Sequence, residues 1–540
     1  MLSQKEKNKY RNHLFKHLDG IAVAPVALSL HQKGVLDFII QNKAVELQEL
    51  TRKFNANEGY LNVAMRLLAS QGWLNYQVDN TKDKILLSTN DKSHFAFSKV
   101  PLYTEAVNYL KASEEFNPRI LNPEQFSVLS KIFKNYIHQK YAPIASNEKE
   151  IKIEKQIAKH IEGVLVGPIT VFLAMDGMFH KYFMEASFTA DEFHEDPENF
   201  SKILDFFVHL GWFSKKNSHY KFTNKGFFFA RRATAYGVTV SYIPTFRKID
   251  ELLFGNANIL RSSLPNATEI HVDREMNVWG SGGAHTAYFK KIDQIIIELF
   301  NKPITEQPKG ILDMGCGNGA FLTHLFEVIE QRTRRGQMLE EHPLFLVGVD
   351  YNKAALKATR ANLIKADIWA KVIWGDIANP QELQKNLNEN YGINLSDLLN
   401  VRTFLDHNRP WQHPKNKNPN RISNSTGAFA CCGKRLPNNL VEENLKEHFE
   451  KWKPYIKKFG LLLIELHTIN PSLAAKNLGK TAVTAYDATH GFSDQFILEL
   501  DVFLKIINEL GLHSVPKYFS KYPANELATV SINYIKSIFS

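Results

Sequence analysis

The amino-acid sequence predicts two kinds of structure in one chain. The C-terminal half has the pattern of an α/β fold with a doubly wound sheet of seven strands, because strand and helix patterns alternate from residue 308 onward. Residues 311–314 have the pattern of a buried strand, and a glycine-rich turn and a helical pattern follow them directly. The N-terminal half holds an internal repeat offset by about 140 residues, which predicts two similar, mainly helical domains.

Length and composition are those of an ordinary globular protein. The chain has 540 residues, of which 44% are hydrophobic and 23% are charged, and such a length predicts about two to four domains. No apolar run approaches the roughly 18 to 20 residues of a membrane span, and the first ten residues are too polar for a secretory signal. Three cysteines do not make a disulfide framework. We therefore expect a reduced, cytoplasmic protein with no membrane partner.

The net charge of +10 is compatible with more than one kind of partner. Spread over 540 residues the charge is mild, and it suits an acidic protein as well as a nucleic acid. Charge alone does not decide between these partners.

The repeat in the N-terminal half is clearest in two pairs of segments. Residues 19–26 (DGIAVAPV) match residues 162–169 (EGVLVGPI), and residues 60–73 match residues 199–212, with Gly-Trp at the end of each. A strand-like hairpin follows each of the later segments. This order of helices and a two-stranded wing resembles two winged-helix domains in tandem.

Winged helices suggest DNA binding, but the third helix of each repeat argues against it. A helix that reads DNA presents Arg, Lys, Asn or Gln to base edges and phosphates. The first helix offers Asn62 and Arg66 among apolar residues, and the second offers Lys202. Five acidic residues within 191–198 precede the second helix and would repel phosphates. We expect no nucleic-acid partner, and instead a structural module that covers the active site or forms a homodimer.

These patterns also give the domain boundaries. Residues 113–150 carry mixed charge and several prolines, and they predict a linker with short helices. The run Gly280-Ser-Gly-Gly283 predicts a loop, which is either a flexible hinge or a segment that closes over a ligand. The predicted parts are 1–112 and 151–255 for the two repeats, 113–150 for the linker, 256–305 for the connecting loop and helix, and 306–540 for the sheet domain.

The glycine-rich turn after the first strand indicates a ligand. Gly315, Gly317 and Gly319 let the backbone turn sharply and let a ligand approach the N–H groups of a helix N-terminus. Dinucleotide-binding proteins use the same device. Three acids accompany the turn: Asp313 in the first strand, Asp350 at the end of the second, where it suits a ribose diol, and Asp376 after the third.

Together these features resemble the class I methyltransferases that use S-adenosylmethionine (SAM). The resemblance implies a Rossmann-like sheet and SAM as the methyl donor, held by the glycine loop and the three acids. The alternative is a degenerate nucleotide-binding fold with an empty crevice.

Two polar clusters follow later strands. Ligands of open α/β sheets bind beyond the carboxyl ends of the strands, where the candidate base His407 lies between Asp406 and Arg409. His467 follows the fifth strand. His490 and Gln495 lie in residues 486–495, which lead into the next predicted helix, at 494–511. Two imidazoles and an oxygen donor suit a first-row divalent ion with open positions, but each histidine equally suits local hydrogen bonds.

Several segments together resemble one family over almost the whole chain. They are the winged-helix repeat, residues 277–285 (NVWGSGGAH), residues 404–410 (FLDHNRP), Glu465-Leu-His467 and the pattern H-x-x-S-x-Q from His490 to Gln495. The family is the metal-dependent C-methyltransferases of polyketide-synthase loading modules, of the apratoxin type. Here the chain ends soon after the last strand, with no attached carrier domain.

The resemblance implies a cofactor, a substrate and roles for individual residues. A mononuclear divalent metal, iron or manganese, would be held by His467, His490 and Gln495. The methyl acceptor would be a malonyl-type group on a separate acyl carrier protein, or a small-molecule acyl substrate. The winged-helix part would serve as a lid or docking region.

The mechanism expected from this resemblance is metal-assisted methylation of carbon. A metal that binds both carbonyl oxygens stabilises the enolate, and the glycine loop, Asp350 and Asp376 hold the methyl group in line. His407 would be a base or a substrate contact, supported by Asp406 and Arg409.

Two other functions compete with this one. The nearest is a metal-free small-molecule O-methyltransferase with a histidine base, which leaves the pair His467 and His490 unexplained. The other is a winged-helix DNA-binding regulator with a methyltransferase-like sensor domain, which the acidic second repeat disfavours.

Overall fold

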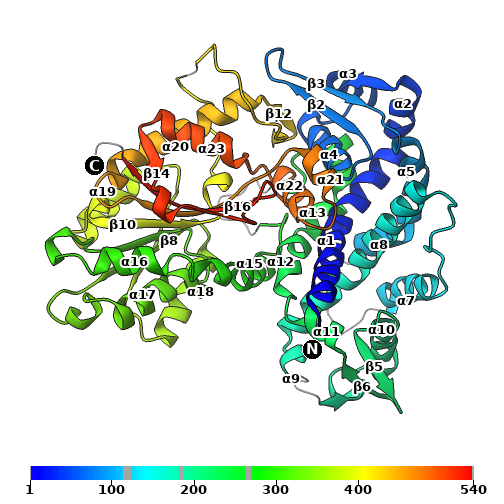
Figure 1. Ribbon diagram of the computed structural model, residues 1–540, viewed down its shortest axis with the longest axis horizontal. Helices are drawn as coiled ribbons and strands as arrows, with labels where there is room; N and C mark the ends of the chain where they lie inside the picture. Colours follow the sequence, from blue (N-terminus) through cyan, green and yellow to red (C-terminus); the bar gives the residue numbers. More distant parts are fainter. Residues whose placement is uncertain (1, 113–122, 182–185, 262–268, 417, 538–540) are drawn as a thin grey trace. The chain divides into compact units, whose positions relative to one another are not determined.

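The computed structural model describes residues 2–112, 123–181, 186–261, 269–416 and 418–537. The chain forms two compact units (Figure 1). The N-terminal unit consists of Met1–Ser281, Ala430–Arg435 and Asn470–Ser493, and the C-terminal unit consists of Gly282–Phe429, Leu436–Ile469 and Asp494–Ser540. Two short segments of the C-terminal half thus belong to the N-terminal unit, which the sequence patterns do not predict.

The N-terminal unit contains two repeats with the same order of elements. The first consists of α1 (Gln4–Gln32), α2 (Val35–Asn42), β1 (Ala44–Glu46), α3 (Leu47–Phe54), α4 (Glu58–Ser70), β2 (Asn75–Asp79) and β3 (Lys84–Ser88). The second consists of α8 (Glu148–Met175), α9 (Met178–Lys181), β4 (Ser187–Phe188), the 3-10 helix η2 (Ala190–Glu192), α10 (Pro197–His209), β5 (Phe213–Lys216) and β6 (His219–Phe222). Their small antiparallel sheets have the equivalent orders β1-β3-β2 and β4-β6-β5. The two predicted winged-helix domains are confirmed.

Further helices complete this unit. They are α5 (Ser93–Lys99), α6 (Thr104–Ala112), α7 (Pro123–Ile137), α11 (Asn224–Ala230), α12 (Thr234–Ser241), α13 (Ile243–Arg247), α14 (Ile249–Phe254), α21 (Pro471–Lys476) and α22 (Val483–Gly491). Helix α7 lies within the predicted linker, of which residues 113–122 are outside the described residues. Phe133 of α7 stacks on Phe206 of α10 with ring centroids 4.1 Å apart, so this part of the linker packs on the second repeat.

The long helices α1 and α8 pack against each other (Figure 1), and they meet at equivalent glycines of the two repeats. A Cβ atom on Gly20 would lie 2.2 Å from Cα of His160, and one on Gly163 would lie 2.3 Å from Cα of His17. The backbones therefore touch at both positions, and only glycine leaves room for this. Each glycine meets the same position of the other repeat, because Gly20 contacts His160 and Gly163 contacts His17. The two repeats are therefore related by approximate two-fold symmetry at the crossing.

Helix α8 is long and apolar enough to cross a membrane, by length and composition. The expectation that no run approaches this length is therefore wrong for α8. Within the N-terminal unit 78% of its apolar window is buried, as in the core helix of a globular domain.

The C-terminal unit is built on one twisted sheet with the strand order β14-β16-β13-β10-β7-β8-β9. The strands are β7 (Gly310–Met314), β8 (Phe345–Asp350), β9 (Lys371–Trp374), β10 (Leu398–Thr403), β13 (Leu461–Leu466), β14 (Leu512–Ser514) and β16 (Val530–Ser537), with a short β15 (Ser520–Tyr522) paired to β16. The first five run parallel, whereas β16 is antiparallel to β13. The predicted seven-stranded, doubly wound sheet is confirmed, and β15 is an addition.

Helices cover both faces of this sheet (Figure 1). They are α16 (Asp293–Phe300), α17 (Ala320–Arg332) and α18 (Lys353–Lys365) on one face, and α19 (Pro380–Tyr391), α20 (Asn438–Ile456) and α23 (Leu500–Glu509) on the other. Trp452 of α20 and Leu387 of α19 pack with Leu312 and Met314 of β7 in one buried cluster. The parallel strands thus end at one edge of a rigid, apolar core.

Two predicted segments differ from the structure. The expected loop at Gly280-Ser-Gly-Gly283 lies inside helix α15 (Arg274–Phe289). A Cβ on Gly280 would lie 2.7 Å from Cα of Gly237, so this glycine serves close packing of helices instead of a turn. The helix predicted at 494–511 begins only at Leu500, and residues 495–498 before it are not helical.

The glycine crossing gives a first testable prediction. Gly20→Ala places a methyl group against the backbone of α8, so we expect the N-terminal unit to lose about 1–3 kcal/mol of stability, as overpacked cores do. Calorimetric melting would measure this loss, with the exposed Asn8→Ala of the same helix as the control. An unchanged melting temperature for Gly20→Ala would contradict the backbone contact.

Candidate active site

The glycine turn after β7 has the backbone geometry of a ligand cradle. Gly315, Gly317 and Gly319 have φ angles of +80°, +57° and +80°. Residues other than glycine rarely adopt such positive φ angles. The N–H groups of Gly315 and Cys316 both donate to the carbonyl of Val349 on β8. Gly319 then caps the N-terminus of α17. The turn is fixed by the neighbouring strand, and the start of α17 faces the ligand edge of the sheet.

The three predicted cofactor acids lie at this edge. Asp350 accepts hydrogen bonds from the N–H groups of Gly317 (3.0 Å) and Asn352 (2.8 Å), so it is held against the glycine turn. Asp376 accepts from the N–H of Ala378 at 2.8 Å. Both assignments to the cofactor stay predictions.

Asp313 has an unusual environment. Its side chain is fully buried, and both carboxyl oxygens lack a hydrogen-bond partner among the described residues. Burial, reinforced by the charge of Asp350, raises the pKa of Asp313 to about 8. A buried acid without partners is unfavourable, and a polar or cationic ligand group beside the turn would supply the missing interaction. These residues therefore fit SAM, whose sulfonium and amino groups carry positive charge.

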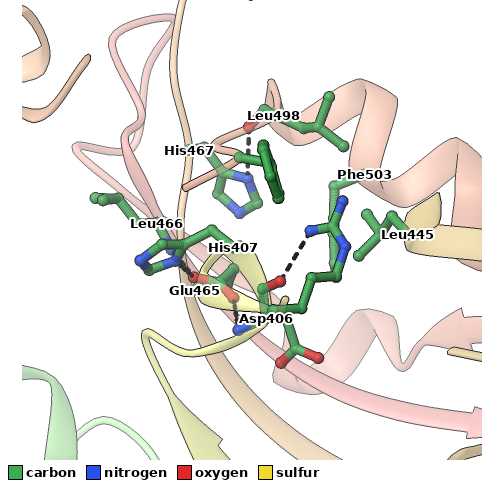
Figure 2. Close-up of a pocket in the computed structure, with 10 residues that line it drawn as sticks. Asp406, His407, Leu445, Glu465, Leu466, His467, Leu498 and Phe503 are labelled. Atoms are coloured by element: carbon green, nitrogen blue, oxygen red, sulfur yellow. Dashed lines mark hydrogen bonds and ion pairs between the residues drawn. The ribbon is translucent and has the colours of Figure 1, made fainter. Parts of the chain in front are cut away.

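The loop after β10 brings His407 to the end of β13. His407 Nδ1 lies 2.6 Å from Oε1 of Glu465, the fifth residue of that strand. Because a carboxylate only accepts, Nδ1 donates its proton, and Nε2 is left as the basic nitrogen. Figure 2 shows the two side chains at one end of the pocket. The pair has the form of a general base with an orienting acid.

Glu465 is the residue that the sequence assignment missed. It accepts three hydrogen bonds, from His407 Nδ1 and from the backbone N–H groups of Asp406 (2.8 Å) and Leu466 (2.7 Å). Its side chain is 3% exposed. The sequence feature that could have indicated Glu465 is its position in Glu-Leu-His at the carboxyl end of an apolar strand. Its partner His407 lies 58 residues earlier in the chain, so no local pattern connects the two.

Asp406 belongs to a buried ionic network behind His407. Its Oδ1 accepts from Arg402 Nη1 at 2.6 Å and from His448 Nε2 at 2.8 Å. Burial alone would raise the pKa of Asp406, but the charge of Arg402 and the hydrogen bond from His448 outweigh it and lower the pKa to about 2. Asp406 is therefore ionised throughout the physiological range and positions the loop without exchanging protons.

Arg409 is also a positioning residue in this structure. Its guanidinium donates to Asn444 Oδ1 and to the carbonyls of Asp406 and Val441, at distances of 2.6, 2.8 and 3.2 Å. These bonds connect the loop after β10 with helix α20. They do not involve His407.

The predicted metal ligands occupy three different environments. His467 is 1% exposed, and its Nδ1 contacts the carbonyl of Leu498 at 3.2 Å while its Nε2 contacts the hydroxyl of Ser531 at 2.7 Å. Since Nδ1 must donate to the carbonyl, the lone pair of Nε2 is taken by Ser531. Burial lowers the pKa of His467 to about 4, so the ring is neutral. As it stands, His467 does not fit a metal ligand.

His490 and Gln495 are placed differently. His490 lies in α22 of the N-terminal unit, where its Nδ1 contacts the carbonyl of Tyr486 at 2.8 Å. Its Nε2 is then the nitrogen with the lone pair, as in metal-bound histidines that donate to a carbonyl. Gln495 belongs to the C-terminal unit and begins the segment before α23. Their role in metal binding stays a prediction.

A pocket joins four of the predicted residues. Its volume is about 230 Å³ when the open solvent at its mouth is included. Its polar lining is Asp406, His407, Arg409, Glu465 and His467, and its apolar lining is Leu445, Leu466, Phe496, Leu498 and Phe503 (Figure 2). The segment before α23 forms one wall, because the N–H of Phe496 donates to the carbonyl of His407 at 2.7 Å.

Comparison with known proteins identifies the domains. Residues 269–533 match the family model of the AprA MT2-like domain, residues 162–256 match that of the AprA winged helix domain, and residues 10–76 match that of the AprA N-terminal domain. No curated protein sequence matches the chain.

Several solved structures match the chain distantly. The mitomycin 7-O-methyltransferase MmcR is 10% identical with a TM-score of 0.39, over 71% of this chain and 98% of MmcR. An O-methyltransferase family protein from Burkholderia thailandensis is 12% identical with a TM-score of 0.33, over 69% and 95%. The CurJ carbon methyltransferase is 11% identical with a TM-score of 0.30, over 76% and 98%. Such distant similarity says nothing about the substrate.

The three family models cover most of the chain, and the winged-helix model falls on the second repeat described above. The protein is therefore a class I SAM-dependent methyltransferase and belongs to the family with the AprA-type domain architecture.

Proposed function

We propose that the protein methylates an acidic carbon beside a carbonyl in an acyl group, with His407 as the base. The observation that supports this most directly is the 2.6 Å hydrogen bond between His407 Nδ1 and Glu465 in the pocket at the end of β10 and β13. The acyl acceptor on an acyl carrier protein is taken from the resemblance to the apratoxin-type C-methyltransferases, with which the match to the AprA MT2-like domain is compatible.

The proposed reaction consists of one proton transfer and one methyl transfer. His407 Nε2 takes the proton from the acceptor carbon, and Glu465 stabilises the imidazolium that results. The electron pair left on the carbon forms the new bond to the methyl group, and the electrons of the broken C–S bond return to sulfur. When bound, SAM supplies a methyl group made electrophilic by its positive sulfur. The glycine turn and Asp350 position the donor, so that much of the barrier is removed by orientation.

A second candidate gives His407 a different role. A histidine that donates Nδ1–H to a carboxylate is also the usual arrangement of a metal ligand. Within the pocket of the C-terminal unit, His407 is then the residue whose Nε2 suits a metal, with His467 held by Ser531. A divalent ion bound there would act as a Lewis acid on the carbonyl oxygens.

The cofactor assignment predicts the effect of a single substitution. Asp350→Asn removes the charge beside the glycine turn, and we expect SAM affinity to fall by about 10-fold or more, since hydrogen bonds to a charged group contribute roughly 1.5–3 kcal/mol. Isothermal titration calorimetry with SAM measures this. The exposed Asp367→Asn is the matched control, and equal SAM affinity in both variants would refute the assignment.

The base assignment predicts two losses of activity. In His407→Ala we expect kcat to fall by about 10²–10⁴, because general-base catalysis contributes this much. In Glu465→Gln the imidazole loses its orienting charge, and we expect a fall of about 10² or more, as for other histidine–acid pairs. The assay is methyl transfer to the malonyl thioester of N-acetylcysteamine, with the exposed His413→Ala as the control. SAM affinity should not change, and full activity of His407→Ala would exclude it as the base.

Metal removal separates the two roles of His407. For the general base we expect activity to persist after dialysis against EDTA. The measurement combines the assay with elemental analysis of the wild type, His407→Ala and His467→Ala. Stoichiometric metal that is lost in His407→Ala but kept in His467→Ala, together with chelator-sensitive activity, would assign the metal-ligand role instead.

A further inference from the structure

Two adjacent cysteines lie at the turn of a short hairpin. The hairpin consists of β11 (Phe429–Cys431) and β12 (Lys434–Leu436), which pair in a two-stranded sheet. The loop between the strands is Cys432 and Gly433, with φ angles of +52° and +78°. A two-residue loop with positive φ at both positions has the pattern of a type I′ turn. Residues 430–435, and therefore both thiols, belong to the N-terminal unit.

Cysteine is an unfavourable residue for this turn. Type I′ turns prefer Asn, Asp or Gly at the first central position, because other side chains are strained at positive φ. Cysteine lacks both the freedom of glycine and the short polar side chain that lets Asn and Asp bond to the local backbone. Strained residues of this kind are concentrated at functional sites. The thiol of Cys432 is therefore a candidate for a function.

The two thiols are within reach of each other and of solvent. Sγ of Cys431 lies 3.9 Å from Sγ of Cys432, and all three cysteines of the chain are reduced. Cys432 is exposed and Cys431 is half-buried, whereas Cys316 is buried. Burial, followed by the charge of Cys432, raises the pKa of Cys431 to about 11. The charges of Arg261 and Lys434 oppose this shift. An oxidant from solvent therefore reacts with Cys432 first and with Cys431 second.

The positions of the two residues determine what kind of disulfide they can form. Consecutive Cα atoms are about 3.8 Å apart across a trans peptide, which is less than the roughly 4.4–6.8 Å usual for disulfides. A disulfide between neighbours is therefore strained, and strained disulfides are easily reduced. It also closes almost no loop, so it adds little stability. Such a bond suits a reversible modification and does not suit a structural cross-link.

The turn packs against the first winged helix. The N–H of Gly59, in the first turn of α4, donates to the carbonyl of Gly433 at 2.8 Å. Arg435 donates to Glu58 at 2.8 Å and to Asp83, between β2 and β3, at 2.7 Å. Closing a disulfide changes the torsion angles of the turn, and these contacts transmit the change to the start of α4.

We propose that Cys431 and Cys432 are a redox-sensitive modification site, which a small disulfide such as glutathione disulfide oxidises reversibly to a vicinal disulfide. The thiolate of Cys432 attacks one sulfur of the oxidant and releases one glutathione. The thiolate of Cys431 then attacks the sulfur of Cys432 and releases the second. The pair loses two electrons and two thiol protons, which end on the two glutathione molecules. The proposal is independent of the methyl acceptor.

The test follows the pair by mass spectrometry in the full chain. The protein is incubated with glutathione disulfide, and the remaining thiols are alkylated. Tryptic digestion then releases residues 422–434, which contain both cysteines of the pair and not Cys316. The variant Cys432→Asn removes the first thiol and places a residue that the turn prefers. The variant Cys431→Ser removes the second thiol and keeps Cys432.

In the wild type we expect the peptide 422–434 to lose two hydrogen atoms and to take up no alkylating reagent. Excess glutathione should reverse this within minutes to hours. In Cys431→Ser we expect glutathione to stay on Cys432 as a mixed disulfide. The oxidised wild type should melt about 2–4 °C below the reduced protein, because the distorted turn loosens the start of α4. The melting temperature of Cys432→Asn should not respond to glutathione disulfide.

Other results overturn the proposal. If both thiols of the wild type are alkylated after oxidation, or if glutathione stays on Cys432, the pair does not close. A disulfide-linked dimer assigns Cys432 to a contact between copies of the chain. A metal ion that is bound by the wild type, absent from Cys432→Asn and protective of both thiols assigns a metal site, although the pair supplies only two of the four ligands that structural zinc takes. An equal melting temperature of the oxidised and reduced wild type overturns the coupling to α4.

Discussion

The buried carboxylate of Glu465 determines the geometry of the pocket at the end of β10 and β13. A desolvated carboxylate is stable only when several donors surround it, and here the donors are the N–H groups of Asp406 and Leu466 and the imidazole of His407. Two of the three come from the loop after β10. The parallel pairing of β10 with β13, in which Thr403 lies opposite Ile464, brings this loop to Glu465. The requirement to satisfy one charge therefore fixes the position of the loop and the tautomer of its histidine.

A second carboxylate so close to Glu465 requires a compensating cation. Asp406 is fully ionised, and Arg402 pairs with it while lying 3.9 Å over the ring of Trp452. His448 of α20 adds a further donor. Because the strand, the loop and α20 all contribute, the network ties the His407 loop to the apolar core of the sheet, and packing remote from the pocket supplies the precision that the proposed catalysis needs.

The sequence predicted the features that depend on local patterns. Four kinds of feature were recognisable, because each leaves a signature within about 20 residues. They are the glycines with positive φ, the acids at strand ends, the alternating strands and helices, and the repeated winged helices. Features that depend on partners distant in the sequence were not recognisable. Gly280 lies in a glycine-rich run that is typical of a loop, but its close contact with Gly237 shows that it serves helix packing. Glu465 was overlooked because its partner His407 is far away in sequence. His467 resembles a metal ligand until Ser531, 64 residues later, is found on its lone pair.

The first winged helix is covered by a later part of the chain. The helix that reads DNA in other winged-helix proteins, α4, is covered here by α21 and α22 of the same unit, with Ser70 hydrogen-bonded to Thr484 at 2.8 Å and Arg66 to Asp487. These two helices follow β13 in the chain, and immediately after them residues 495–498 form a wall of the catalytic pocket. One continuous segment therefore leaves the strand that carries Glu465, covers α4 and returns beside His407. This excursion ends at Ser493, and three residues later the N–H of Phe496 donates to the carbonyl of His407. The segment after β13 thus contributes both to the covering of α4 within the N-terminal unit and to the support of the His407 loop within the C-terminal unit.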